Sequence, residues 1–326
     1  MILNFTFLII SVIASYSVFI NSNFISKKLK IIDLPKKNSI HKIPIPKTGG
    51  IIILTILFIE FSITSLNDFR VSDLIEFFII FIIFIIGLID DIIDLKPIIR
   101  IILLTLFSLL LIKSNEIFLI TDLNFKNFYN TDIYLKEFAT IFTIFCIIVF
   151  CNSFNFIDGI NGLAISLGIL WILLIPIDII EKILIVTSLL FILINNLKNK
   201  IFLGNSGSLL LSFYIAIKFI EYYNKTEFLS ADQIFICFLI PGLDLVRLFF
   251  ERIFNKRSPF SGDLNHFHHL IFRYFSSTNK SLVFYLFLVS TSIAISFLSE
   301  IKSLYIVIFN FILYFIILSY FKRKLK

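Results

Sequence analysis

Long apolar runs recur along the whole of this sequence, and they restrict the possible fold more than any other feature. A helix that crosses a membrane needs about 17 to 25 mostly apolar residues. Because backbone polar groups inside a bilayer must be satisfied within the protein, such runs predict an all-α polytopic membrane protein. We expect one membrane-embedded domain over residues 1–326. About eleven candidate spans occur, several short or broken by a polar residue: 2–20, 50–66, 74–89, 98–112, 138–151, 163–175, 179–197, 208–220, 234–249, 281–298 and 304–320.

The composition excludes an ordinary soluble globular protein. Hydrophobic residues make up 58% of the chain and charged residues only 16%, whereas soluble domains are about 25% charged. The cysteines, Cys146, Cys151 and Cys237, lie in or beside apolar runs without the spacing of a metal site. We therefore expect small core side chains rather than a disulfide framework or a thiolate site.

Basic residues predict the topology. No lysine or arginine precedes the first span, and Lys27, Lys28 and Lys30 follow it, which is the reverse of a cleavable signal peptide. With the N-terminus outside, most of the 29 lysines and arginines fall in cytoplasmic loops and in a cytoplasmic C-terminus. The net charge of +7 is thus mainly a topology signal. Its dispersal over membrane loops does not favour a nucleic-acid surface.

Three carboxylates, Asp90, Asp91 and Asp94, end an otherwise apolar run. At separations of three and four residues, all three can share one face of a helix. A charge at the centre of a bilayer costs roughly 2.5 to 3.5 kcal/mol on the mildest scale, so the cluster needs a reason. It is either a helix end at the water boundary or a divalent-cation site, since Mg²⁺ is usually held by carboxylates together with substrate phosphates. The spacing alone leaves both interpretations open.

Two glycine-containing segments precede spans on the same side of the membrane. The backbone N–H groups of Gly49 and Gly50 can approach an anion closely. Residues 201–208 place Gly and Ser at a helix start, which is a typical anion cradle. In that segment Asn205 or Ser208 can equally be an ordinary N-cap. Each signal is weak by itself.

Residues 152–162 are far more polar than a membrane boundary requires. They contain three asparagines, one aspartate and two glycines. A turn explains some of these residues. Buried polar groups are costly unless they pair with one another or with a ligand, so we expect a polar ligand pocket here.

The longest cytoplasmic loop carries His266, His268 and His269, three of the protein's four histidines, together with several arginines. The imidazoles can bind a metal, or the histidines and arginines can donate to phosphate oxygens. Zinc is disfavoured because no cysteine or spaced histidine completes a tetrahedral set.

Taken together and in this order, the five segments resemble the polyprenyl-phosphate N-acetylhexosamine-1-phosphate transferases of glycosyltransferase family 4. The His266-x-His268-His269 triplet, preceded by Ser-Pro-Phe and Asp263, resembles the N-acetylglucosamine branch. The resemblance implies transfer of a sugar-1-phosphate from a UDP-N-acetylhexosamine to undecaprenyl phosphate, with release of UMP, as the first membrane step of cell-surface polysaccharide synthesis. It also implies a location in the cytoplasmic (inner) membrane and Mg²⁺ as cofactor, with Mn²⁺ as an alternative. A homodimer stays open.

The same resemblance assigns roles to residues. It implies catalysis by Asp90, Asp91 and Asp158, and a metal ion held by these three carboxylates with Asn205. It implies that Phe202 stacks on uracil. The residues expected to contact substrate are His41, Lys47, Lys96, Asn152, Asn155, Asn161, Phe202, Asp263, His266, His268 and His269.

Two positions depart from the family pattern. Asn205 stands where the family has a metal-binding aspartate; its carbonyl oxygen can still bind Mg²⁺, but a negative charge is lost. Asn161 stands where many bacterial members have aspartate, which we interpret as substrate tuning. The alternatives are a lipid-linked sugar transporter, an inactive scaffold relative, or a muramoyl-pentapeptide-type transferase. A transporter predicts carboxylates near the bilayer midplane and similar repeats in both halves, whereas here the carboxylates cluster at one surface and no repeat is visible.

Overall fold

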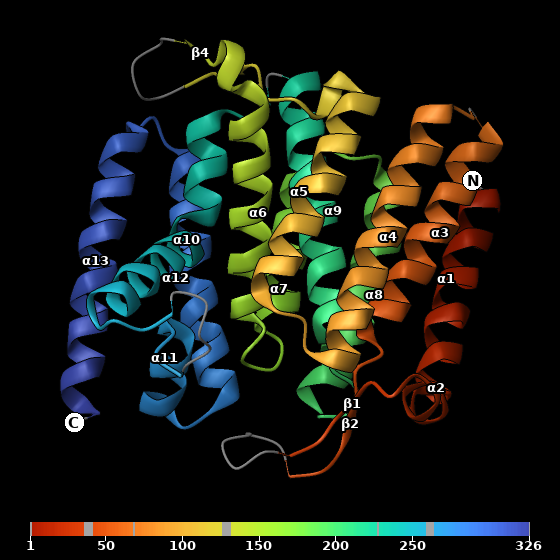
Figure 1. Cartoon of the computed structure of the whole chain (residues 1–326), viewed down its shortest axis with the longest axis horizontal. Coiled ribbons are helices and arrows are strands. Elements are labelled where there is room, and N and C mark those ends of the chain that lie inside the picture. Colours follow the sequence, from red (N-terminus) through yellow and green to blue (C-terminus); the bar gives the residue numbers. More distant parts are fainter. Residues whose placement is uncertain are drawn as a thin grey trace.

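The protein is a bundle of helices that run roughly side by side (Figure 1). The computed structural model describes residues 2–35, 42–67, 69–125, 132–226, 228–258 and 264–325. Within these ranges the helices are α1 (Ile2–Ile20), α2 (Ser22–Leu29), α3 (Gly49–Asn67), α4 (Val71–Ile93), α5 (Pro97–Ser114), α6 (Ala139–Ile157), α7 (Leu163–Leu174), α8 (Ile179–Leu197), α9 (Gly204–Lys225), α10 (Ala231–Phe254), α11 (Phe267–Phe275), α12 (Thr278–Leu298) and α13 (Ser303–Lys324). Short connecting elements complete the described chain: strands β1 (Ile32–Asp33) and β2 (Ile45–Pro46), which pair antiparallel, β3 (Asp122–Leu123) and β4 (Ile133–Tyr134), which also pair antiparallel, and the 3₁₀ turns Glu116–Phe118 and Lys136–Phe138.

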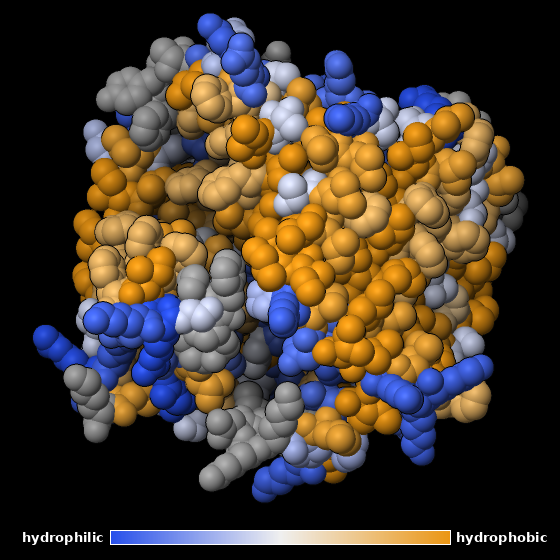
Figure 2. Space-filling view, viewed as in Figure 1, coloured by the Kyte–Doolittle hydropathy of each residue, from blue (hydrophilic) through white to orange (hydrophobic). Residues whose placement is uncertain are grey.

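The described helices confirm an all-α polytopic membrane protein. Eight are long and apolar enough to cross a membrane, and the number rises to nine if α1 and α2, which are bent by 61° at their junction, form one broken span. Apolar side chains cover the middle of the face shown in Figure 2, and hydrophilic ones gather toward its two ends. This distribution is what a bilayer imposes on a spanning protein.

Each of the eleven expected spans coincides with an α-helix, but α7 and α9 are not among the helices long and apolar enough to cross a membrane, and α1 qualifies only together with α2. Helix α7 has only 12 residues. Helix α9 is buried along nearly its whole length and carries polar side chains, and it packs against α3, α4 and α6. A helix surrounded by protein does not need a lipid-like surface, and this explains why α9 is less apolar than its neighbours.

Aromatic side chains fill the core around α9. Trp171 of α7 is fully buried, and its ring lies 5.2 Å from that of Phe150 and 4.9 Å from that of Phe238. Cys151 and Cys237 are buried and free, and Cys146 is half-buried and free, as expected for small core side chains.

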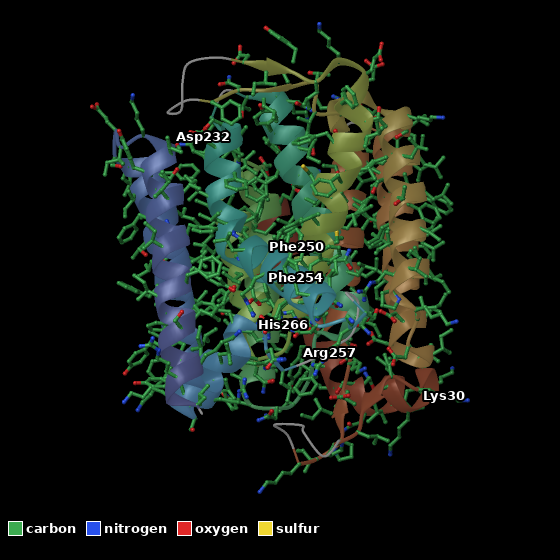
Figure 3. The ribbon with its side chains drawn as sticks, turned by 60° about the vertical axis from the view of Figure 1, so that its left-hand side comes forward. Lys30, Asp232, Phe250, Phe254, Arg257 and His266 are labelled. Atoms are coloured by element: carbon green, nitrogen blue, oxygen red, sulfur yellow. The ribbon has the colours of Figure 1, made fainter. Side chains whose placement is uncertain are left out.

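The polar segments gather at one end of the bundle, which is the lower end in Figure 1. Figure 3 shows Lys30, Arg257 and His266 toward this end and Asp232 at the other. The exposed Phe250 and Phe254 lie between these levels. The marks for the N- and C-termini lie toward opposite ends of the bundle (Figure 1).

Candidate active site

A pocket of about 480 Å³ opens at the lower end of the bundle. Segments far apart in the sequence meet there. Its wall contains charged, amide and aromatic side chains together, which is the mixture found in sites for polar organic ligands. The lining residues are Asp33, Lys47, Asp91, Asn155, Asp158, Gly159, Ile160, Asn161, Asn196, Phe202, Gly204, Asn205, Leu264, His269, Phe272 and Arg273.

Asp91 lies at the N-terminus of α9. Its carboxylate accepts the backbone N–H of Asn205 and that of Ser206, each at 2.9 Å, and the Asp91 side chain is fully buried. The first N–H groups of a helix lack partners within the helix and carry a partial positive charge. The anion in the predicted cradle of residues 201–208 is therefore Asp91 of the protein itself.

Gly204 makes this contact possible. Its backbone has φ +74°, and a Cβ atom added there would lie 2.7 Å from Asp91 Oδ2. Any other residue would be strained and would push the carboxylate away. The sequence left Asn205 or Ser208 open as an ordinary N-cap, but both lie inside α9, which begins at Gly204. The cap comes instead from α4.

Lys47 faces the same carboxylate, with its Nζ 3.3 Å from Asp91 Oδ1. The segment after it is fixed by backbone hydrogen bonds, because Gly49 N–H donates to the carbonyl of Phe202 at 2.9 Å and Gly50 N–H donates to that of Leu203 at 3.1 Å. These N–H groups, which the sequence left available to an anion, are engaged by backbone carbonyls. They tie the Lys47 loop to the segment that carries Phe202.

Asp158 follows the end of α6 and points into the pocket. Among the described residues, no hydrogen bond or ion pair engages its carboxylate. Burial, and secondarily the negative charge of Asp91, raise the pKa of Asp158 to about 8, while Lys47 opposes this rise. Desolvation and a nearby like charge both favour the neutral acid.

Amide side chains form the wall next to Asp158. Asn155 accepts a hydrogen bond from Ser208 Oγ at 2.6 Å, and Asn161 donates to Asn199 Oδ1 at 2.7 Å. Asn196 accepts the N–H of Gly162 at 2.6 Å. Asn196 lines the pocket, yet the sequence analysis missed it. The Asn-Asn pair at 195–196, beside the lysines 198 and 200, was the available signal.

Asp90 does not line this pocket. It accepts hydrogen bonds from Leu95 N–H at 2.7 Å and from Arg100 Nη1 at 3.2 Å, and Arg100 Nη2 donates to Asn152 at 3.2 Å. The structure thus brings two predicted residues, Asp90 and Asn152, to one buried arginine rather than to the pocket. A buried carboxylate needs such a partner.

The expectation that three aspartates share one helix face is wrong. Helix α4 ends at Ile93, and Asp94 adopts a left-handed conformation with φ 54°. Pro97 starts the next helix and disfavours helical geometry at the residue before it. Asp94 and Lys96 are both exposed outside the pocket.

The three histidines lie in three different environments. Only His269 lines the pocket. His266 is buried; its Nδ1 lies 3.0 Å from Asp244 Oδ2, and its ring stacks on Phe156 at 4.9 Å. No described residue offers a hydrogen-bond partner to Nε2 of buried His268, and burial lowers the pKa of this imidazole well below the ordinary value.

Gly159 faces the histidine pair. A Cβ atom there would lie 2.7 Å from His268 Nε2 and 2.8 Å from His269 Cε1. The α11 segment therefore packs directly on the loop that carries Asp158. Two further lining residues, Asp33 and Arg273, were missed because neither belongs to a recognisable local pattern. His41 and Asp263 lie outside the described residues.

The pocket residues suit a hard divalent cation. Asp91, Asp158 and Asn205 offer only oxygen ligands, which Mg²⁺ prefers. Burial chiefly, and secondarily the negative charge of Asp91, raise the pKa of Asp158, and a bound cation would favour the ionised carboxylate against both effects.

A second group, Asp244, His266 and His268, has ligand atoms within 4.8 Å of one another. It suits a hard cation such as Mg²⁺ less well, because two of its three members are imidazoles and Mg²⁺ prefers oxygen ligands. Both oxygens of Asp244 already accept hydrogen bonds, and the Arg247 guanidinium lies 2.8 Å from one of them. The positive charge of Arg247 thus already balances the Asp244 carboxylate.

The polar end of the bundle therefore holds the features by which the sequence resembles a known family. Residues 74–223 match the model of glycosyl transferase family 4. This match confirms the resemblance for the segment that contains Asp91, Asp158 and α9. Lys47 and the histidine loop lie outside it.

Similar proteins from three bacteria, all with the same name, agree with the family match. This chain is 33% identical over 138 residues to the undecaprenyl-phosphate alpha-N-acetylglucosaminyl 1-phosphate transferase of Thermotoga maritima, and the match covers 41% of this chain and 45% of the relative. The enzyme of that name from Yersinia pestis is 30% identical over 154 residues, covering 43% of this chain and 42% of the relative. The one from Escherichia coli K12 is 29% identical over 161 residues, covering 45% and 44%. In each case the match spans less than half of the relative's length.

Proposed function

We propose that the protein transfers N-acetylhexosamine-1-phosphate from a UDP-N-acetylhexosamine to undecaprenyl phosphate and releases UMP. The observation that carries this proposal is the convergence of Lys47, Asp91 and Asp158 in one pocket at the end of a membrane bundle. The family match and the printed names of the relatives agree with it.

The pocket suits a nucleotide sugar in size and chemistry. Its volume of about 480 Å³ lies within the usual range of about 300 to 1,000 Å³ for small-molecule sites. Phe202 offers a ring on which a base can stack. The cations Lys47 and Arg273 can donate charge-assisted hydrogen bonds to diphosphate oxygens, and the asparagine wall can pair with sugar hydroxyls.

Mg²⁺ would be held by Asp158, Asp91 and the carbonyl oxygen of Asn205. When bound, it neutralises the diphosphate and the charge that develops on the leaving group. Asp91 is committed to the α9 amides and to Lys47. We therefore assign to Asp158, whose carboxylate has no such commitment among the described residues, the role of orienting the reacting phosphates.

The proposal includes a topology. We place the pocket in the cytoplasm, with eleven spans, the N-terminus outside and the C-terminus inside, in the cytoplasmic (inner) membrane. The lysines and arginines at the pocket end, among them Lys30 and Arg257 (Figure 3), support this orientation because basic residues mark cytoplasmic loops. The lipid acceptor then reaches the pocket from the inner leaflet, at the start of a cell-surface polysaccharide.

The test is UMP release by purified protein supplied with Mg²⁺, undecaprenyl phosphate and a panel of UDP-sugars. We expect one UDP-N-acetylhexosamine to support turnover and to identify the sugar. Asp158→Asn should lower the rate by at least about 100-fold, the scale typical of an essential charged group. Asp94→Asn, an exposed aspartate of the same polar end, is the matched control and should keep the wild-type rate.

Two outcomes would contradict the proposal. Absence of UMP release with every donor would exclude the enzyme and favour an inactive relative, for which Asn205 in the pocket is the specific argument. Full activity of Asp158→Asn would leave the reaction standing and remove the site assignment.

A further inference from the structure

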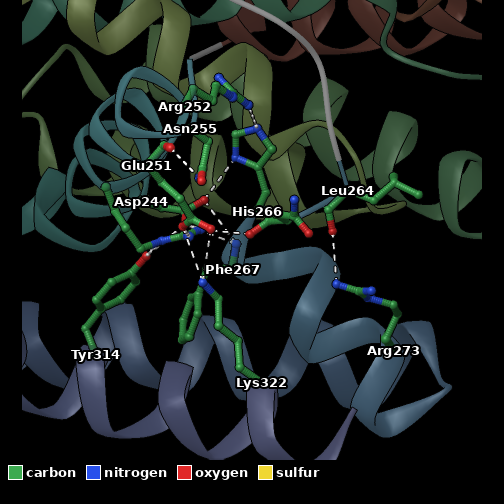
Figure 4. A network of polar contacts seen from close by, with 12 residues as sticks. Asp244, Glu251, Arg252, Asn255, Leu264, His266, Phe267, Arg273, Tyr314 and Lys322 are labelled. Atoms are coloured by element: carbon green, nitrogen blue, oxygen red, sulfur yellow. Dashed lines mark hydrogen bonds and ion pairs between the residues drawn. The ribbon is translucent and has the colours of Figure 1, made fainter. Parts of the chain in front are cut away.

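One carboxylate, Asp244 of α10, joins three other segments of the chain (Figure 4). It accepts hydrogen bonds from His266 Nδ1 at 3.0 Å, from the backbone N–H of Phe267 at 3.1 Å and from the hydroxyl of Tyr314 at 2.8 Å. The Asp244 residue is 5% exposed. Removing water from a carboxylate is costly, and this number of donors is what offsets the cost.

Phe267 is the first residue of α11, so Asp244 caps that helix. The formal N-cap residue, His266, makes no side-chain cap hydrogen bond. A carboxylate at a helix N-terminus satisfies an unpaired N–H and interacts favourably with the helix dipole. The α11 helix carries His269 and Arg273, both of which line the pocket. The position of Asp244 therefore fixes where these two side chains lie.

Asp244 and the groups that donate to it, on His266, Phe267 and Tyr314, form a joint between α10, α11 and α13. Arg247 neutralises Asp244 in this joint and also contacts Tyr314 of α13. Its Nη2 atom lies 2.8 Å from Asp244 Oδ1, its Nε donates to Tyr314 Oη at 2.9 Å, and Nη2 also donates to the carbonyl of Asn265 at 2.7 Å. The ring of Tyr314 packs on that of Phe267 at 4.8 Å. The last helix is thus in contact with both the cap and the first residue of α11.

The other side of the joint reaches the Asp158 loop. The ring of His266, held by Asp244, stacks on Phe156, two residues before Asp158. Arg252 Nη2 lies 3.5 Å from His266 Nε2, and its guanidinium lies 6.0 Å from the centre of the Phe156 ring. Asp244 is therefore linked to both walls of the pocket without lining it.

We propose that Asp244 and Tyr314 are positioning residues, which hold the N-terminus of α11 so that His269 and Arg273 face the donor diphosphate. The inference rests on the proposed function for the identity of the ligand. According to this inference, α13 supports the candidate site through Tyr314. Asp244 and Tyr314 both lie outside the matched segment 74–223.

The decisive variant is Tyr314→Phe, which removes one hydroxyl and keeps the ring that packs on Phe267. The matched control is Tyr305→Phe on the same helix, because this residue is 62% exposed and makes none of these contacts. Two measurements are made on protein in lipid nanodiscs: amide hydrogen exchange over residues 264–275, and the KM and kcat for the UDP-sugar.

A hydrogen bond to a charged group is usually worth a factor of about ten or more. We therefore expect Tyr314→Phe to speed exchange at the start of α11 by about tenfold. The KM for the UDP-sugar should rise by a similar factor, with a smaller change in kcat. A purely structural role would lower the folded fraction, and hence the apparent kcat, without raising KM. Asp244→Asn should act in the same direction and more strongly, and Tyr305→Phe should change neither quantity.

Unchanged exchange together with an unchanged KM in Tyr314→Phe would overturn the inference, as would a fall in kcat alone. Failure of the proposed function looks different, because the wild type would then release no UMP with any donor. The exchange measurement does not require turnover, so it tests the joint in either case.

Discussion

The carboxylate of Asp91 accepts the backbone N–H of Asn205 at 2.9 Å and so closes the first turn of α9 from a different helix. The negative charge of Asp91 thus lies at the N-terminus of α9, where a substrate phosphate could otherwise bind, and Asp91 is also a proposed metal ligand. The end of α4 and the start of α9 are thus held together by a group of the candidate site itself. Changes at Asp91 should therefore affect stability as well as activity.

Asp91→Asn should lower stability by about 1 kcal/mol or more, because a neutral amide is a weaker acceptor and leaves Lys47 without its ion pair. Thermal unfolding of purified protein measures the effect. The matched control is Asp94→Asn, which should change stability by no more than about 0.5 kcal/mol, since asparagine tolerates the left-handed conformation at that position. Equal losses of stability in the two variants would refute the role of Asp91 as the cap of α9.

The stability of metal-free protein should depend on the protonation of Asp158. Its pKa is about 8 when folded, against an ordinary value of 3.8, so the folded state holds the proton more tightly than the unfolded chain. The stability contributed by the neutral acid is lost as pH rises toward and through 8. The Asp158→Asn variant lacks this loss. The melting temperature of Asp158→Asn minus that of the wild type should therefore increase as the pH rises from 5 to 8.

Thermal unfolding in a chelator across this pH range provides the measurement. Mg²⁺ added at high pH should raise the melting temperature of the wild type more than that of the variant, because it binds the ionised carboxylate. A difference that stays constant with pH would show that Asp158 does not titrate in this range.

Gly159→Ala should disturb the site, since a Cβ atom would lie 2.7 Å from His268 Nε2. Overpacking of this kind costs about 1 to 3 kcal/mol, or displaces α11 from the Asp158 loop. We expect slower UMP release in either case. Gly242→Ala is the matched control, because nothing lies within 4 Å of a Cβ atom there. Similar activity in both variants would show that the histidine pair moves freely.

A buried ion network, separate from the pocket, should be important for stability alone. Lys218 of α9 lies 3.1 Å from Glu76 and 2.9 Å from Glu221, with its side chain 13% exposed. Lys218→Met leaves buried Glu221 and largely buried Glu76 without this partner and should cost about 3 to 5 kcal/mol. Lys225 also pairs with Glu221 but is 47% exposed, so Lys225→Met should cost no more than about 1 kcal/mol. Chemical unfolding in mixed micelles would rank the two, and a larger effect at Lys225 would contradict the assignment.

Asn205→Asp would restore a charge that the family pattern contains. A third carboxylate beside Asp91 and Asp158 should strengthen Mg²⁺ binding and shift the Mg²⁺ concentration for half-maximal UMP release downward. The same charge should destabilise the metal-free protein through repulsion. An unchanged Mg²⁺ dependence would place Asn205 away from the ion.

Much of this architecture could be predicted from local patterns. Apolar runs indicated the helices because the bilayer requires a minimum length of apolar chain. Polar loops on one side indicated a shared site, and Lys47, Asp91, Asp158, Phe202 and His269 do line one pocket. Arg273 was not identified because no motif distinguishes it, and Asn196 was missed although it belongs to an Asn-Asn pair.

The different environments of adjacent residues could not be predicted. Asp90 and Asp91 are neighbours in the sequence, yet one pairs with Arg100 and the other caps α9. Successive residues of a helix point about 100° apart, so each meets a different neighbour. His266 and His269 diverge because His266 precedes α11 and bonds to Asp244, whereas His269 lies inside that helix and lines the pocket.

The sequence by itself determined that this chain spans a membrane many times and collects its polar residues at one end, because the hydrophobic effect and backbone hydrogen bonding act through local composition. Only the tertiary structure decided which carboxylate caps a helix, which one faces the pocket without a partner among the described residues, and that Tyr314 of α13 supports Asp244. Those outcomes depend on contacts between segments distant in the sequence, and helix packing alone sets them.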